Sequence, residues 1–314
     1  NPNWINRDRF VLSNGHGSML LYSLLHLTGY KLSIDDIKDF RQLNSITPGH
    51  PECDITPGVE TTTGPLGQGL ANAVGMALAE KSLASEFNKK DHNLIDHYTY
   101  VFSGDGCLME GISHEVCSLA GTLGLNKLIL IYDMNNISID GDTSIAFTEN
   151  IKKRFDSYGW NVIDNVDGHD FSSIEQSISR AKRETSRPTI ICMKTTIGFG
   201  APNKEGTSGI HGAPLGESEV QLTRKNLGWK FEPFHIPKYI YNEWDATVFG
   251  KNLEKSWNKE LVSYKKSYPK LYAELQRRLK NKLPSILTKK IDFLIENNDK
   301  SMATRKSSQV VLEH

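Results

Sequence analysis

The sequence lacks the features that mark several classes of protein. Its 37 Lys and Arg residues equal its 37 Asp and Glu residues, so no excess charge attracts nucleic acid or an anionic membrane surface. No apolar run reaches the roughly 20 residues that cross a bilayer. The opening Asn1-Pro2-Asn3-Trp4 has no signal-peptide pattern. We therefore expect no nucleic-acid partner, no membrane partner and a cytoplasmic location.

Cysteine is also scarce. The four cysteines form no CxxC pair and have no regular spacing, at Cys53, Cys107, Cys117 and Cys192. This pattern argues against a disulfide framework and against a zinc site. We expect four reduced thiols. No internal repeat is visible, which excludes solenoids and propellers.

Short β-rich runs alternate with longer helical patterns over the first two thirds of the 314 residues. Strands are predicted at 98–102, 128–132, 160–163 and 189–193, and helices at 18–28, 66–85, 112–123 and 172–183. The continuous apolar run at 128–132 is typical of a strand covered on both faces. The pattern predicts an α/β fold with a doubly wound, mainly parallel sheet and helices on both faces.

From about Gly216 the strand signals stop. Helices are predicted at 243–267 and 268–281, with Pro269 and Pro284 as boundaries. We interpret this tail as a C-terminal helical extension that leads out of the domain.

Two predicted strands end in polar loops, Ser103-Gly104-Asp105-Gly106 and Asp133-Met134-Asn135-Asn136-Ile137. Ligands of open α/β sheets bind at such carboxyl ends. The Asp105 carboxylate, the Asn135 side-chain carbonyl and the Ile137 backbone carbonyl are hard oxygen ligands. They suit Mg²⁺, with Ca²⁺ or Mn²⁺ as alternatives, and not Zn²⁺. Gly104 and Gly106 leave the backbone bare for a phosphate.

Three histidines lie on loops rich in glycine and proline, at His16, His50 and His211. Such loops position binding groups, and an imidazole there can bind phosphate or transfer protons. The alternative is an exposed loop histidine without a role. His26, His97 and His114 lie in helix or strand patterns, and we interpret them as structural.

A glycine-rich loop at 60–69 runs into the start of a predicted helix. It lacks the lysine of a nucleotide-binding P-loop. Its bare backbone beside Leu66 better suits a flat ring. Glu110 and Glu115 follow the Gly104-Asp105-Gly106 loop. Each is either an ordinary carboxylate favoured by the helix dipole or a group that reaches a cofactor or a neighbouring subunit.

Five motifs together resemble the transketolase family. They are Ser-Asn-Gly-His-Gly-Ser at 13–18, Thr-Pro-Gly-His-Pro-Glu at 47–52, Glu-Thr-Thr-Thr-Gly-Pro-Leu-Gly-Gln-Gly at 60–69, Gly-Asp-Gly-Cys-Leu-Met-Glu-Gly at 104–111 and His-Gly-Ala-Pro-Leu-Gly at 211–216. The likeness continues through Asn226-Leu227-Gly228-Trp229 and covers essentially the whole chain. It is to the N-terminal, diphosphate-binding domain of the long single-chain bacterial type.

The resemblance implies a set of residue roles. Asp105, Asn135 and the Ile137 carbonyl would hold the divalent metal. His16, Gly106 and His211 would contact the diphosphate of thiamine diphosphate. Gly64 and Leu66 would line the cofactor rings, and His16, His50 and His211 would face substrate and assist proton transfer. Glu110 resembles the family's buried glutamate that links the two active sites across a homodimer, and Asp133 resembles a carboxylate that supports the metal loop.

The implied reaction is the reversible transfer of a two-carbon ketol unit from a ketose phosphate to an aldose phosphate, in the pentose phosphate pathway. The cofactor acts as the electron sink. The implied substrates are xylulose 5-phosphate, ribose 5-phosphate, sedoheptulose 7-phosphate, glyceraldehyde 3-phosphate and erythrose 4-phosphate.

Length is the main departure from the family, whose members run to about twice this chain. The pyrimidine-binding domain, its cofactor-activating glutamate and the phosphate-binding arginines are missing. We predict a cofactor-binding domain at 1–225, a helical extension at 226–303 and the start of a truncated pyrimidine-binding domain at 304–314. We expect a truncated or proteolysed chain, inactive by itself. The final Leu312-Glu313-His314 fits either a native sequence or the start of an expression tag.

Other interpretations stay open. A dihydroxyacetone synthase shares most of these motifs, whereas a deoxyxylulose-phosphate synthase differs in the loop at 47–52. A non-catalytic cofactor-binding module is the alternative from another class. Intact Asp105, Asn135 and His211 argue against a decayed site.

Overall fold

The computed structural model describes residues 1–297 and 301–313. Of the final three residues, His314 therefore lies outside the described part. The chain divides into two compact units, Asn1–Ser256 and Trp257–His314. The domain boundaries predicted after residues 225 and 303 stay predictions.

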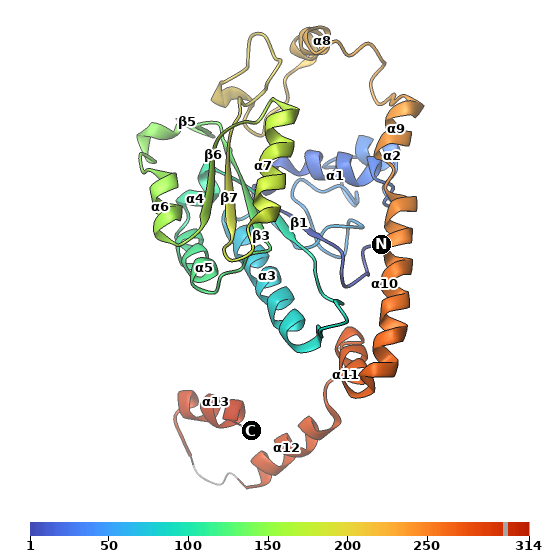
Figure 1. Ribbon diagram of the computed structural model, residues 1–314. Coiled ribbons are helices and arrows are strands. Elements are labelled where there is room, and N and C mark those ends of the chain that lie inside the picture. The colour runs from blue at the N-terminus through green and yellow to red at the C-terminus, as the bar shows by residue number, and fades with distance from the viewer. Residues whose placement is uncertain (298–300, 314) are drawn as a thin grey trace. The chain divides into compact units, whose positions relative to one another are not determined.

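The first unit is built on a parallel sheet (Figure 1). In the described residues the sheet has five strands in the order β1-β2-β3-β7-β6, and every neighbouring pair is parallel. The strands are β1 (Arg9–Leu12), β2 (Thr99–Gly104), β3 (Leu128–Met134), β6 (Asn161–Asp167) and β7 (Thr189–Lys194). A separate antiparallel pair joins β4 (Ile137–Ser138) to β5 (Gly141–Asp142).

Helices follow most strands. In the first unit they are α1 (Ser18–Leu27), α2 (Ile34–Lys38), α3 (Gln68–Phe87), α4 (Asp105–Met109), α5 (Gly111–Thr122), α6 (Ile151–Ser157), α7 (Phe171–Arg183), α8 (Glu217–Asn226) and α9 (Lys238–Trp244). α10 (Thr247–Ser267) runs from the first unit into the second, which also holds α11 (Pro269–Leu279), α12 (Ser285–Glu296) and α13 (Thr304–Glu313).

The sheet is covered on both faces, which explains its continuous apolar strands. One core packs Leu128, Leu130 and Ile190 against α3, α5 and α6. On the other face, Ile129 and Ile191 pack against α7. On that second face, Leu12 of β1 packs against α1. The predicted α/β fold is confirmed.

The four cysteines are free, and three of them are buried. Burial raises the pKa of the Cys117 and Cys192 thiols to about 12. Both therefore stay protonated and pack as small apolar side chains.

Two local predictions need correction. Asp105 does not lie in a loop but begins the short helix α4 directly after β2. The helix predicted at 243–267 is two helices, because α9 ends at Trp244 and α10 begins at Thr247. The Asp245 carboxylate accepts a hydrogen bond from the Thr247 N–H at 2.8 Å, and such local bonding favours a helix start over a continuing helix.

The predicted proline boundaries hold. Pro269 is the first residue of α11, and Pro284 immediately precedes α12. Proline suits these positions because its missing N–H has no partner in the first turn of a helix. Among the described residues, no helix is both long enough and apolar enough to cross a membrane.

Candidate functional site

The carboxyl ends of β2 and β3 bring the two polar loops together. The strands are parallel neighbours, and Gly104 lies opposite Asp133 in the register. The residues that follow each strand therefore emerge at the same edge of the sheet. The main chain after β3 bonds directly to the first residue of α4, since the Asn136 N–H donates to Asp105 Oδ2 at 3.0 Å.

Asp105 is buried at this edge, with 4% of its surface exposed. The Tyr132 hydroxyl donates to its other oxygen, Oδ1. Burial raises the pKa of the Asp105 carboxyl, and the nearby Asp133 and Asp142 add to that rise. Two hydrogen bonds leave lone pairs free on a carboxylate. A cation beside it would offset the cost of burying its charge.

Asn135 has a defined amide orientation. Its Nδ2 donates to Asp133 Oδ2 at 3.2 Å, and its Oδ1 accepts from the Ile137 N–H at 2.9 Å. The turn between these residues needs Asn136 in the left-handed region, at φ +60°, which asparagine tolerates better than most residues.

The donor set is chemically hard. In the described part of the chain, no group of three or more His, Cys, Asp and Glu side chains could hold a metal. The predicted ligands are instead one carboxylate, one amide oxygen and one backbone carbonyl, at Asp105, Asn135 and Ile137. Such oxygen donors fit Mg²⁺ or Ca²⁺ and not Zn²⁺.

His16 and His211 come together from distant parts of the chain. His16 lies in the 3-10 helix Gly15–Gly17, and His211 directly follows the 3-10 helix Ser208–Ile210. Their rings stack with centroids 4.6 Å apart and an interplanar angle of 24°. Burial lowers the pKa of His16 to about 4, with His211 and His50 adding to the shift. His16 is therefore a neutral imidazole near neutral pH.

His50 lies beside the glycine-rich loop. A Cβ placed on Gly64 would stand 3.4 Å from the His50 Cγ. The turn that carries His50 is attached to α1, because the Ser18 hydroxyl donates to the Gly49 carbonyl at 2.8 Å. The His50 side chain itself is exposed.

The glycine-rich loop closely approaches α4 and the 3-10 helix Gly15–Gly17. A Cβ on Gly106 would stand 2.9 Å from Leu66 Cδ1, and one on Gly15 would stand 2.7 Å from Thr63 Oγ1. Larger side chains at these glycines would collide with that loop. Of the predicted ring-binding residues, Leu66 thus lies near the predicted diphosphate contact Gly106, and Gly64 lies near Gly15 and His50.

Glu110 lies at the junction of α4 and α5, and a Cβ on Gly67 would stand 3.0 Å from the Glu110 Cβ. Both Glu110 and Glu115 are exposed in the single chain. The single chain therefore does not show the burial that the resemblance implies for Glu110.

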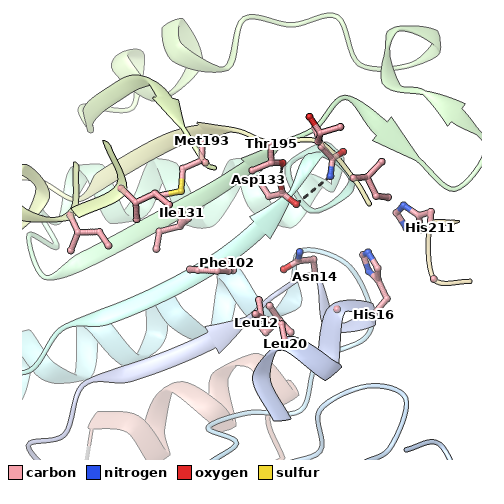
Figure 2. Close-up of a pocket in the computed structure, with 18 residues that line it drawn as sticks. Leu12, Asn14, His16, Leu20, Phe102, Ile131, Asp133, Met193, Thr195 and His211 are labelled. Atoms are coloured by element: carbon pink, nitrogen blue, oxygen red, sulfur yellow. Dashed lines mark hydrogen bonds between the residues drawn. The ribbon is translucent and has the colours of Figure 1, made fainter. Parts of the chain in front are cut away.

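A cavity of about 540 Å³ opens beside these groups (Figure 2). Its polar lining includes His16, His211, Asn135 and Asp133, and the rest is mainly apolar. Asp105 lines a second cavity instead, of about 230 Å³. The structure therefore brings Asn135 and two of the three predicted histidines to one cavity, with Asp105 joined to it through the main chain of Asn136.

Three site residues escaped prediction. Tyr132 donates to Asp105, Thr195 donates to Asp133, and Asn14 lines the larger cavity. Asn14 lies two residues before His16 in the Ser-Asn-Gly-His-Gly-Ser motif at 13–18. Its place in that motif is the indication in the sequence that it belongs to the site. Thr195 is 62 residues from Asp133, and only the sheet register connects them.

Several buried polar atoms at the site have no hydrogen-bond partner. Among the described residues these include Asn14 Oδ1, Thr63 Oγ1 and His211 Nδ1. Buried polar atoms without partners are rare in native proteins and indicate a missing ligand or water. These three atoms fit a polar ligand, and the oxygen donors of Asp105, Asn135 and Ile137 fit a divalent metal; a diphosphate cofactor needs both.

His26, His97 and His114 have other contacts. His26 Nδ1 bonds to the Leu32 carbonyl at 2.7 Å, and His114 Nδ1 bonds to the Tyr158 hydroxyl at 3.0 Å. His97 is buried just before β2 rather than in it, near Asn6. These contacts agree with a structural role.

Comparison with known proteins gives a consistent set of relatives. The family model described as "Transketolase, thiamine diphosphate binding domain" matches residues 1–284. A transketolase of Buchnera aphidicola (subspecies Schizaphis graminum) is 62% identical over all of this chain, which covers 48% of that relative. Transketolase 1 of Escherichia coli K12 is 57% identical with the same coverage. The chain thus spans about half the length of the curated relatives it matches.

Solved structures agree. A Pichia stipitis transketolase in complex with sedoheptulose 7-phosphate matches with a TM-score of 0.89 and 49% identity, over 92% of this chain and 43% of that one. A transketolase of Leishmania mexicana matches with the same TM-score and 46% identity, over 91% of this chain and 43% of that one.

Proposed function

The chain belongs to the transketolase family, as the thiamine diphosphate-binding domain, and we propose that it anchors the metal and the diphosphate of that cofactor. In the complete enzyme it would serve the transfer of a two-carbon ketol unit from a ketose phosphate to an aldose phosphate. One observation carries this proposal. The sheet edge joins Asp105 to the Asn135–Ile137 turn beside the stacked His16 and His211.

Each residue has a proposed part in binding. Asp105, Asn135 and the Ile137 carbonyl would hold Mg²⁺, for which Ca²⁺ or Mn²⁺ could substitute. His16, Gly106 and His211 would contact the diphosphate. A neutral His16 can donate one hydrogen bond to an acceptor-only phosphate oxygen without a proton being taken up first. Gly64 and Leu66 would lie against the cofactor rings.

Thiamine diphosphate, when bound, supplies the electron sink for cleavage of the carbon–carbon bond. The chain's own side chains would orient substrate and move protons. We assign this role to His16, His50 and His211, and the unpartnered His211 Nδ1, available to a substrate or cofactor atom, supports it.

We propose sugar phosphates as the substrates. The Pichia stipitis transketolase has been solved with sedoheptulose 7-phosphate, with xylulose 5-phosphate and with fructose 6-phosphate. The exposed Glu110 suits a homodimer in which a second subunit buries it. We also propose that the complete enzyme acts in the pentose phosphate pathway and in the cytoplasm.

Calorimetry with the purified chain tests the proposal. Titration of thiamine diphosphate in the presence of Mg²⁺ should show binding that disappears without the metal. Asp105→Asn should weaken it at least tenfold, because a neutral amide replaces the proposed anionic ligand. Asp35→Asn is the matched control, since Asp35 is an exposed carboxylate whose partner is Lys38.

Binding that survives Asp105→Asn unchanged would contradict the proposed metal site. No binding at millimolar cofactor with Mg²⁺ would contradict the proposed cofactor site and would favour a catalytically dead module that serves in assembly.

A further inference from the structure

We propose that Thr195 is a positioning residue: acting through Asp133, it determines which end of the Asn135 amide faces the metal. This inference rests on the proposed metal site, and it concerns a residue in a different strand–loop unit from every proposed ligand. Thr195 directly follows β7, whereas Asp105 follows β2 and Asn135 follows β3.

Three side chains form a continuous relay. The Thr195 hydroxyl donates to Asp133 Oδ1, and Asn135 Nδ2 donates to Asp133 Oδ2 at 3.2 Å. Both carboxylate oxygens of Asp133 are therefore occupied by donors. Figure 2 shows Asp133 and Thr195 facing each other at the wall of the larger cavity.

The relay settles the orientation of the amide. An ionised carboxylate only accepts hydrogen bonds, so the end of Asn135 that faces Asp133 must be the NH₂ group. The carbonyl oxygen then faces the opposite way, where the Ile137 N–H donates to it at 2.9 Å. That oxygen keeps a second lone pair for a cation. The opposite orientation would present an NH₂ group, which cannot ligate Mg²⁺.

Thr195 makes this orientation rigid because its hydroxyl donates to Asp133 Oδ1, the carboxylate oxygen that does not bond to Asn135. Without the hydroxyl, Asp133 Oδ1 would have no donor among the hydrogen bonds of the described side chains, and the carboxylate could rotate. The Asn135 amide would then lose one of its two fixed partners and keep only the Ile137 N–H. Groups that orient metal ligands in this way typically contribute 10- to 100-fold to metal affinity.

The backbone around Thr195 is itself closely constrained. The Gly168 N–H donates to the Lys194 carbonyl at 2.9 Å, and a Cβ on Gly168 would stand 2.5 Å from Thr195 Cγ2. Gly168 thus lies close to the Thr195 methyl group, and a larger side chain at position 168 would displace it.

Metal binding measured without catalysis tests the relay. Mn²⁺ would be titrated into the full chain with saturating thiamine diphosphate, and the free ion followed by electron paramagnetic resonance. Thr195→Val keeps the shape and removes the hydroxyl, so we expect the Kd for Mn²⁺ to rise roughly 10- to 100-fold. Thr195→Ser restores the hydroxyl and should return the Kd to within a few-fold of the wild type.

A second variant and a control complete the experiment. Asp133→Asn should raise the Kd for Mn²⁺ by a similar factor. An amide at position 133 can bond to either end of the Asn135 amide, so it would not select one orientation. Thr223→Val removes a hydroxyl that donates to the Glu219 carbonyl within α8, and it should leave the Kd unchanged. Unfolding temperatures of all variants would show that each is folded.

The possible outcomes distinguish a failure of the relay from a failure of the proposed metal site. If the wild type binds Mn²⁺ and Thr195→Val binds it equally well, the relay is wrong and the proposed site stands. If Thr195→Ser is as weak as Thr195→Val, the hydroxyl is not the group that matters, and the relay is again wrong. If the wild type binds no Mn²⁺, the proposed metal site fails and the relay fails with it.

Discussion

His16 is partly buried at the candidate site, and this burial makes the stability of the folded chain depend on pH. Its pKa in the folded chain is about 4, lowered from 6.5 first by burial and then by His211 and His50. The unfolded chain therefore binds a proton at His16 more readily than the folded chain does. The stability associated with neutral His16 is complete above pH 6.5 and is lost as the pH falls toward 4.

His16→Gln should consequently flatten this dependence. We expect the variant to lose less free energy of unfolding than the wild type between pH 7 and pH 4.5, measured by urea denaturation. Burial also lowers the pKa of His97 to about 4. His97→Gln should therefore also reduce the slope of the free energy of unfolding against pH. An unchanged slope in His16→Gln would show that His16 is not buried as a neutral group.

Helix packing depends on small residues at particular points. Gly121 lies in α5, and a Cβ there would stand 1.8 Å from the Tyr158 carbonyl oxygen. Gly75 lies in α3, where a Cβ would have nothing within 4 Å. The two glycines are thus a matched pair of helical positions in different surroundings.

Alanine should have opposite effects at these positions. Gly121→Ala should lower the free energy of unfolding by about 1–3 kcal/mol, because the backbone must shift to admit the methyl group. Gly75→Ala should raise it by about 0.5–1 kcal/mol, because alanine is the better helix former. Denaturant unfolding measures both, and a stable Gly121→Ala chain would mean that α5 does not pack against Tyr158 as described.

Elements with one clear periodicity were predicted well, and short ones were not. The strand at 128–132 and the helix at 172–183 were recognised because a buried run and an amphipathic pattern differ clearly. The five-residue α4 was missed because Gly104-Asp105-Gly106 has the composition of a turn. The end of α9 was missed because Asp245 interrupts the helix through a side-chain bond that spacing does not reveal.

The larger cavity of the described chain has few groups that suit a sugar phosphate. The chain spans 48% of the Buchnera and Escherichia coli transketolases it matches. The cavity of about 540 Å³ has no lysine or arginine among the described residues that line it. A sugar phosphate held there would have no lysine or arginine of the cavity lining as a partner, whereas the proposed metal would pair with the diphosphate of the cofactor.

We therefore expect the purified chain to have no measurable ketol transfer from xylulose 5-phosphate to ribose 5-phosphate, even with thiamine diphosphate and Mg²⁺ present. A coupled assay of glyceraldehyde 3-phosphate formation measures this. The calorimetric titration on the same preparation serves as the control for a folded cofactor site. Robust turnover would show that half of a transketolase length suffices for catalysis.

The sequence by itself determined the fold class and predicted the chemical character of the site. Apolar runs alternating with helical patterns predict a parallel sheet, and polar residues directly after two strands predict a metal site at its carboxyl edge. These inferences depend on local spacing, which the sequence shows directly. The motifs around His16, Asp105 and His211 further identified the family that the comparisons support.

Only the tertiary structure decided which distant groups meet. The stacking of His16 on His211 joins residues 195 positions apart, and the Thr195–Asp133 bond depends on the register between β3 and β7. The burial that keeps His16 neutral likewise comes from packed neighbours. Contacts between distant residues depend on how strands and helices pack, and no local pattern of residues encodes them.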